Sequence, residues 1–316
     1  MGHVCGNTPL VDAGGIYAKL ECTNPTGSVK DRIAKYIIDK SEEQGVLEKG
    51  MCIVEATSGN TGIAVSYYGA LRGYDVKIVM PKNMTEERKT YIKEMGAQLI
   101  TCSEGDFGEA AQIRDKITEL PNYFNPDQFS NPLNVECHQV TTGQEILEQM
   151  KQYSDKIDAF VAGTGTGGTL IGVGKALRAV FPDIRIVAVE PKESAVMSGG
   201  KPGLHGIQGI GDGFIPPIAG DGKGGTHELI DEVICISTEE AKNTALAIQE
   251  EYGFCVGISS GANYLAAKQL KERFGTVVTV FADGYAKYQS EGLKYCGEGR
   301  CKYEDPEARV FTFHKK

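Results

Sequence analysis

The chain has 316 residues, and its 41% hydrophobic and 24% charged residues are ordinary globular values that exclude wholesale disorder. Its 33 basic and 42 acidic residues give a formal net charge of −9, and no basic stripe is present, so we expect no nucleic-acid partner. All apolar runs fall short of the roughly 18 residues that span a bilayer, so we expect no membrane partner either.

Segments typical of buried strands alternate along the chain with segments of helical apolar spacing. The expected strands cover residues 52–56, 76–80, 98–102, 159–162, 184–189 and 277–281. The expected helices cover residues 61–71, 86–95, 109–120, 170–180, 238–252 and 263–274. This alternation predicts an α/β protein in which helices cover both faces of parallel-type sheets.

Two irregular stretches divide this pattern. Residues 122–142 are rich in Pro, Asn and Gln, and they predict a boundary between two α/β domains, residues 1–134 and 135–316. Residues 201–225 hold nine glycines and three prolines, and they predict a long loop of the kind that covers a site.

The nine cysteines are scattered, and no two of them form a C-x-x-C pair. The N-terminus lacks the charged start and the apolar core of a signal peptide. We therefore expect reduced, mostly buried thiols in a cytoplasmic protein. Cys296 and Cys301 are the closest pair, and only the lone His314 follows them, so we expect no metal site. Whether this pair is redox-active is left open.

A lysine motif is the most informative feature of the chain. In the run from Asn24 to Arg32, the turn formers Pro25 and Gly27 precede Lys30, and helical apolar spacing follows it. A lysine at the junction of a loop and a helix can serve as an imine-forming amine. The alternative is a solvated surface lysine.

A glycine-rich motif covers residues 163–169, after an expected strand and at the start of an expected helix. Its backbone N–H groups and the helix N-terminus predict a phosphate cradle. The spacing of Gly163, Gly165 and Gly168 also satisfies the dinucleotide fingerprint, and Glu190 stands near the position of a ribose-binding acid. Taken alone, this segment favours a nicotinamide-binding protein; a loop needed only for packing is a further alternative.

Two further loops lead into helices. Residues 57–62 offer hydroxyls, an amide and N–H groups to an anion such as a carboxylate, and helix capping is the alternative. In residues 257–262, capping by Ser259 or Ser260 is the simplest interpretation of that segment taken alone.

Taken together, these segments resemble the fold-type II pyridoxal-phosphate enzymes, most closely the cysteine synthase (O-acetylserine sulfhydrylase) and cystathionine β-synthase branch. The resemblance rests on residues 6–11, 24–32, 55–62, 128–132, 141–143, 165–169, 207–211 and the segment around Ser259. It implies two mixed, mainly parallel sheets wrapped by helices, as in the tryptophan synthase β fold. It also implies that about the first 20 residues cross to the second domain.

The resemblance assigns roles residue by residue. Lys30 resembles the lysine that forms the internal aldimine and then acts as the base. The residues that resemble the cofactor site are Lys30, Asn60, Gly165, Thr166, Gly167, Gly168, Thr169 and Ser259. The residues that resemble the pocket for the substrate carboxylate are Thr57, Ser58, Thr61 and Gln128.

The implied activity is β-replacement or β-elimination on L-serine-type amino acids through an α-aminoacrylate. A dehydrogenase explains neither Lys30 nor the loop of residues 57–62, so that alternative is set aside. The resemblance also implies a homodimer, and it leaves open a non-enzymatic role as a partner of serine acetyltransferase.

Three departures from the cysteine synthase pattern bear on substrate choice. Ala56 replaces a common proline, and Asp283 stands where it can alter the electronics of the cofactor. Asp212 stands in the long loop of residues 201–225, at a position where alanine is usual in cysteine synthases. It is either a solvated loop residue or a carboxylate that activates water. The last possibility predicts an enzyme that consumes L-cysteine and releases hydrogen sulfide.

Overall fold

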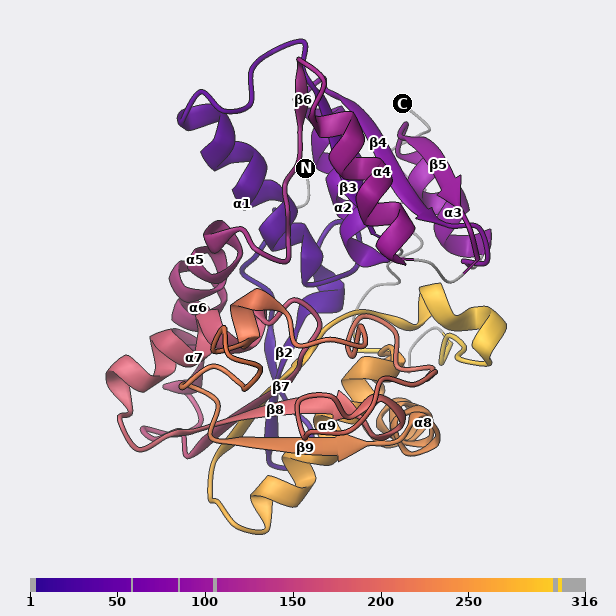
Figure 1. Cartoon of the computed structure of the whole chain (residues 1–316). Coiled ribbons are helices and arrows are strands. Elements are labelled where there is room, and N and C mark those ends of the chain that lie inside the picture. The colour runs from indigo at the N-terminus through magenta and orange to yellow at the C-terminus, as the bar shows by residue number, and fades with distance from the viewer. Residues whose placement is uncertain (1–3, 58, 85, 105–106, 298–300, 303–316) are drawn as a thin grey trace. The chain divides into compact units, whose positions relative to one another are not determined.

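The computed structural model describes residues 4–57, 59–84, 86–104, 107–297 and 301–302 (Figure 1). Unit 1 consists of Met1–Val29 together with Asn134–Lys316, and unit 2 consists of Lys30–Leu133. Within the described ranges, each unit holds one sheet. The division into domains at residue 134 stays a prediction.

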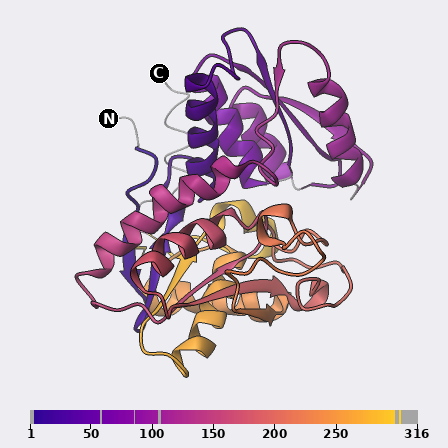
Figure 2. The same cartoon turned by 60° about the vertical axis from the view of Figure 1, so that its left-hand side comes forward.

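Unit 2 is built on a parallel sheet in the order β5-β4-β3-β6. Its strands are β3 Cys52–Ala56, β4 Asp75–Pro81, β5 Gln98–Cys102 and β6 Tyr123–Phe124. Its helices are α1 Lys30–Glu43, α2 Asn60–Leu71, α3 Glu86–Glu94 and α4 Phe107–Thr118. Figure 2 shows α1 and α2, in indigo and violet, on one side of this sheet and α4, in magenta, on the other.

The alternation of side chains along each strand explains these two layers. Val54 and Val79 pack in one apolar cluster with Ala110 of α4. Ile53, one position from Val54, points to the other face, where it lies beside Gly69 of α2. Successive strand residues face opposite sides, so both faces are buried and the strands read as continuous apolar runs.

Unit 1 is built on a mixed sheet in the order β1-β2-β10-β7-β8-β9, in which only β1 and β2 are antiparallel among the described strands. Its strands are β1 Leu10–Asp12, β2 Ile16–Leu20, β7 Ala159–Gly163, β8 Arg185–Pro191, β9 Glu232–Ile236 and β10 Val277–Phe281. Its helices are α6 Thr142–Met150, α7 Gly168–Val180, α8 Thr238–Tyr252 and α9 Ile258–Lys271, and α5 Pro132–Val140 leads into it. The 3-10 turns are η1 Glu21–Thr23, η2 Lys192–Ser194, η3 Pro217–Ala219 and η4 Tyr285–Glu291.

The same alternation sorts the core of unit 1. Phe160 of β7 packs in a cluster with Ile146 of α6 and Leu170 of α7. Val161, the next residue, packs in a cluster with Ala245 of α8 and Ala266 of α9. The sheet is therefore covered by one pair of helices on each face, which brings the loops after the strands to one edge.

The predicted fold class is confirmed: the protein is α/β, with two sheets wrapped by helices. Several predicted elements have the observed bounds, including β3, β5, β10 and α8. Six elements were not predicted from the sequence: β1, β2, β6, β9, α5 and α6. Helix α9 begins at Ile258 instead of the predicted residue 263. Among the described residues, no helix is long and apolar enough to cross a bilayer.

Candidate functional site

Lys30 is the first residue of α1 and is partly buried. The next residue, Asp31, is fully buried and accepts a hydrogen bond of 3.2 Å from the Tyr68 hydroxyl of α2. This bond ties the first turn of α1 to its neighbour, so the backbone that carries Lys30 is held within unit 2.

The turn that precedes Lys30 belongs to unit 1 and is anchored there. The backbone N–H of Val29 donates to the carbonyl of Ala282 at 2.8 Å. The buried Lys287 side chain of η4 donates to the carbonyls of Thr26 and Gly27 at 3.0 and 3.4 Å. Sequence reasoning missed Lys287, because nothing in its local pattern marks a lysine that folds inward.

The loop before α2, residues 57–62, was predicted to bind a carboxylate. The N-cap of α2 is Gly59, which has no side-chain capping bond, so capping does not explain the polar residues of this loop. The Thr61 hydroxyl donates to Gln128 Oε1 at 2.7 Å, and Thr57 is buried in the same segment. The structure thus brings Thr61 and Gln128 together, whereas Ser58 lies outside the described residues.

Glu55 lies at the base of this loop and is fully buried. Its carboxylate accepts hydrogen bonds from the N–H groups of Ala56 at 3.0 Å and Gln128 at 3.4 Å, and Arg114 Nη1 lies 3.6 Å away. Burial raises the pKa of Glu55 to about 7, although Arg114 and both hydrogen bonds act to lower it. Nothing in the sequence marks Glu55 as a site residue, because it lies in an ordinary strand pattern.

The glycine-rich loop of unit 1 forms a backbone cradle at the start of α7. Its N-cap, Gly167, has a φ of +89°, a conformation that favours glycine. A Cβ atom on Gly165 would lie 2.3 Å from the Gly209 carbonyl oxygen, and one on Gly168 would lie 1.8 Å from Asn134 Oδ1. Among the described residues, no acceptor is bonded to the N–H groups of Gly165, Thr166 and Gly167. Three donors therefore remain beside the positive end of a helix.

Side chains of α5 hold the two threonines of this loop. Asn134 Nδ2 donates to Thr166 Oγ1 at 3.0 Å, and His138 Nε2 lies 3.2 Å from Thr169 Oγ1. His138 is itself oriented by the Thr142 hydroxyl, 2.9 Å from Nδ1. Asn134 and His138 are missed by sequence reasoning, because the Pro, Asn and Gln residues of 122–142 predict a boundary and not a helix.

Ser259 lies in the first turn of α9 and is 5% exposed. The N-cap of this helix is Gly257, without a side-chain capping bond, so the interpretation of Ser259 or Ser260 as a cap is wrong. The Ser260 hydroxyl is buried and has no partner within the described residues. Asp283 packs against Gly257, so closely that a Cβ atom added to Gly257 would lie 2.0 Å from Asp283 Oδ1. Asp283 Oδ2 accepts a hydrogen bond of 2.6 Å from the Tyr288 hydroxyl.

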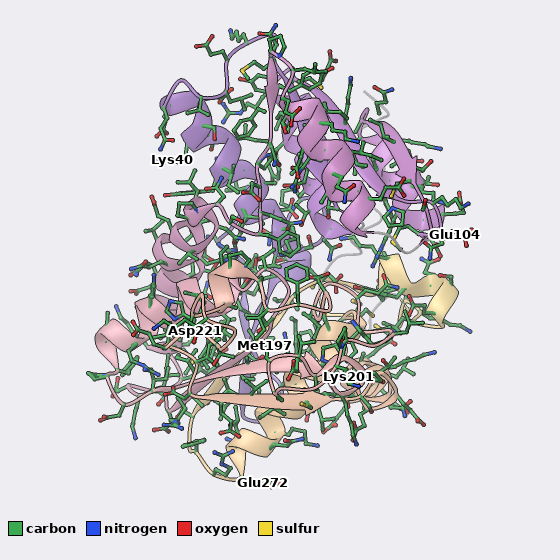
Figure 3. The ribbon with its side chains drawn as sticks, in the orientation of Figure 1. Lys40, Glu104, Met197, Lys201, Asp221 and Glu272 are labelled. Atoms are coloured by element: carbon green, nitrogen blue, oxygen red, sulfur yellow. The ribbon has the colours of Figure 1, made fainter. Side chains whose placement is uncertain are left out.

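The loop of residues 201–225 lies against the phosphate cradle through its middle part; Figure 3 labels Lys201 and Asp221 on it. Apart from η3, the loop has no helix. The Gly211 N–H donates to the carbonyl of Thr164 at 3.1 Å, and the Gly211 carbonyl lies 2.8 Å from His205 Nε2. Asp212 follows Gly211 directly and is exposed.

Glu190, the residue that favoured a dinucleotide, is 1% exposed near the end of β8. Its two carboxylate oxygens accept from the N–H groups of Met197, labelled in Figure 3, and Ser198 at 2.8 and 2.9 Å. This carboxylate organises the turn that follows β8, and is thus not presented to a ribose.

The model of the family described as "Pyridoxal-phosphate dependent enzyme" matches residues 3–283. The chain belongs to this family. It is 43% identical over 303 residues to a cysteine synthase of Staphylococcus aureus, a match that covers 92% of this chain and 95% of that protein. A probable cysteine synthase of Bacillus subtilis is 41% identical over 301 residues, covering 91% and 95%.

Solved structures of this pyridoxal-phosphate dependent family give the same result. Cysteine synthase from Entamoeba histolytica superposes with a TM-score of 0.84 at 36% identity, covering 99% of this chain and 94% of that one. A hydrogen sulfide-producing enzyme from Fusobacterium nucleatum superposes with a TM-score of 0.82 at 39% identity, covering 94% and 87%. The predicted resemblance to this branch of the family is confirmed.

The cofactor of the family is pyridoxal phosphate, and the residues present fit it. The cradle of residues 165–169 offers N–H donors to a phosphate. Neighbouring atoms lie so close to its glycines that no larger residue would fit at these positions. Lys30 carries a primary amine, and Ser259 carries a neutral hydroxyl. The cradle and Ser259 belong to unit 1, whereas Lys30 and Asn60 belong to unit 2.

Proposed function

We propose that the chain catalyses β-replacement and β-elimination on L-serine-type amino acids, in the manner of a cysteine synthase. The observation that carries this proposal is the cradle of residues 165–169, whose unbonded N–H groups at the start of α7 suit the phosphate of the family's cofactor. The identity of 43% to a cysteine synthase over most of the chain supports the same activity.

The proposal gives the cofactor residues the following roles. Residues 165–169 would hold the phosphate, Lys30 would hold the cofactor covalently, and Asn60 would donate a hydrogen bond to it. When bound, pyridoxal phosphate supplies an electron sink for the negative charge that develops at the substrate's Cα. Ser259 is the partner of the pyridine nitrogen, and since a hydroxyl does not favour ring protonation as a carboxylate does, it suits prompt loss of a β-leaving group.

The substrate is held and deprotonated by residues of unit 2 in this proposal. Thr57, Ser58, Thr61 and Gln128 bind the α-carboxylate, and the Thr61–Gln128 hydrogen bond of 2.7 Å keeps two of them in one cluster. The Lys30 amine would accept the proton from the substrate's Cα.

A second candidate is an enzyme that consumes L-cysteine and releases hydrogen sulfide. Asp212 favours it, because a carboxylate in the covering loop could take a proton from an attacking water. Two structural relatives from Fusobacterium nucleatum are described as hydrogen sulfide-producing enzymes, at 39% and 35% identity. The two candidates share one cofactor site and differ in the nucleophile that adds at Cβ.

Steady-state rates on one preparation separate the candidates. A synthase forms cysteine from O-acetylserine and sulfide faster than it releases sulfide from cysteine alone, and a sulfide producer reverses this order. Cofactor-loaded protein that turns over neither substrate would contradict both candidates.

We further propose that the protein is a cytoplasmic homodimer that binds serine acetyltransferase. Homodimers and this partner follow from the resemblance to cysteine synthases, and light scattering of the purified protein tests the first. Co-elution with serine acetyltransferase tests the second, and a chain that binds this partner yet lacks turnover would support the non-enzymatic role instead.

A further inference from the structure

Three thiols of unit 1 meet at the end of α8, outside the candidate site. Cys255 is buried three residues after α8 ends at Tyr252, and Cys296 and Cys301 are partly buried in the segment that follows η4. The Sγ atoms of all three lie within 4.8 Å of one another. Cys255 is 41 residues distant from Cys296 in the sequence, so the fold, and not a local motif, assembles this cluster.

Backbone contacts hold the cluster in place. The Cys296 N–H points at Cys255 Sγ at 3.3 Å, and the Lys302 N–H donates to the Gly253 carbonyl at 3.0 Å. Gln249 of α8 also donates to the Lys294 carbonyl. These bonds fix the described residues on either side of Cys296 and Cys301, and so hold both thiols near Cys255.

We propose that Cys255, Cys296 and Cys301 form a binding site for one thiophilic divalent cation of the Zn²⁺ class. A Zn–S bond of about 2.3 Å in tetrahedral geometry separates sulfur atoms by about 3.8 Å, which the observed spacing reaches by shifts below about 1 Å. On binding, three S–H bonds break, three protons pass to solvent, and three metal–sulfur bonds form. Water takes the fourth position.

A lysine, Lys302, directly follows the third cysteine of the cluster in the chain. Three thiolates and a divalent cation carry one net negative charge, and Lys302 Nζ lies 5.4 Å from the ring centre of Phe254, the neighbour of Cys255. A metal site explains why three sulfur atoms converge, whereas a disulfide engages only two.

This site would brace the wall of the candidate active site without being part of it. The Cys255 carbonyl accepts from the Tyr285 N–H at 3.1 Å, and Gly257, two residues on, is the N-cap of the helix that carries Ser259. Metal binding would therefore join the segment after η4 to the start of α9. The inference stands on the three thiols and does not depend on the proposed function.

Titration of the reduced, cofactor-loaded protein with Co²⁺ and with Zn²⁺ tests the proposal. We expect one Co²⁺ per chain, with the red d–d absorption of tetrahedral thiolate coordination, displaced by Zn²⁺. Cys296→Ser and Cys301→Ser should each weaken binding by about 100-fold or more, because the loss of a group that merely orients a ligand already costs 10–100-fold. Cys52→Ser, a free cysteine of unit 2, is the matched control and should bind as the parent does.

Three outcomes would overturn the proposal. They are no stoichiometric Co²⁺ uptake by the reduced protein, uptake that persists in both Cys296→Ser and Cys301→Ser, and uptake lost equally in Cys52→Ser. Peptide mapping after air oxidation distinguishes the alternative: a Cys255–Cys296 disulfide without metal uptake in the reduced state would make the cluster a redox pair. Both serine variants keep Cys255, so the buried thiol is not disturbed and the variants are expected to fold.

Discussion

Glu55 is a buried carboxyl whose ionisation is linked to folding near neutral pH. Its pKa is raised from 4.5 to about 7, so between those values the unfolded chain has already lost the proton that the folded chain still holds. Glu55 therefore contributes on the order of 3 kcal/mol to the free energy of unfolding below about pH 4.5. This contribution is lost as the pH rises to about 7.

Glu55→Gln should flatten this part of the pH profile, since the amide does not titrate. The parent should lose more of its free energy of unfolding than the variant between about pH 4.5 and 8, as measured by urea denaturation. Glu232→Gln is the contrasting control. The Arg273 hydrogen bond lowers the pKa of Glu232, so this carboxyl changes stability only at pH values below those at which Glu55 titrates. Parallel profiles for the parent and Glu55→Gln would show that folding does not raise the pKa of Glu55.

Lys30 should account for both the colour and the turnover of the enzyme. Lys30→Ala should lose the covalently held cofactor, read as loss of the visible band after dialysis, and nearly all activity, because both the linkage and the proposed base disappear. Lys35→Ala on the same helix removes an exposed lysine and should leave both properties unchanged. An active Lys30→Ala protein is incompatible with the proposed mechanism.

Asp212 tests the choice between the two candidate functions. Asp212→Asn keeps the shape but removes the base, so release of sulfide from cysteine should fall by about 10²-fold or more. Binding of the cofactor should stay intact, because the cradle of residues 165–169 is untouched. Asp221→Asn removes the same charge from the same exposed loop and should not change the rate. Equal rates for the two variants would make Asp212 a solvated loop residue.

At the scale of elements, η4 supports the turn that leads into α1. Lys287→Met leaves the carbonyls of Thr26 and Gly27 without their donor, so the protein should lose about 2 kcal/mol of stability. Lys271→Met is the matched control. Lys271 also donates to a backbone carbonyl, that of Gly275, but its side chain is exposed to solvent. Its loss should cost at most about 0.5 kcal/mol. Similar urea midpoints for both variants would contradict this support.

Strands that are buried on both faces could be predicted from the sequence, because nearly every residue in them is apolar. Strand β9 was missed since its Glu232 and half-buried positions break that pattern. Helix α5 was missed because Pro132 and its polar residues read as a boundary, although proline suits the first turn of a helix. Motifs located the cradle and Lys30, whereas Asn134, Lys287 and Glu55 gain their meaning only from partners distant in the chain.

At the scale of the whole molecule, strand β2 leaves the ribosome long before β10, one of the two strands that it pairs with. Ile16 pairs with Val277, and at about 20 residues per second at most, β2 waits for about 13 s or more. Unit 2 is continuous from Lys30 to Leu133 and needs no such delay. Nascent chains arrested before residue 277 should therefore protect unit 2 from proteases but leave residues 4–29 open to cleavage; equal protection would contradict this order.

Strand β2 thus spends the synthesis of the chain with one edge exposed. Until β10 arrives, the edge of β2 that it will cover presents a row of unpaired N–H and carbonyl groups. On crowded polysomes, neighbouring nascent chains could exchange the antiparallel β1–β2 pair. The arrival of β10 covers the open edge of β2, and it ends the period in which two copies can exchange strands.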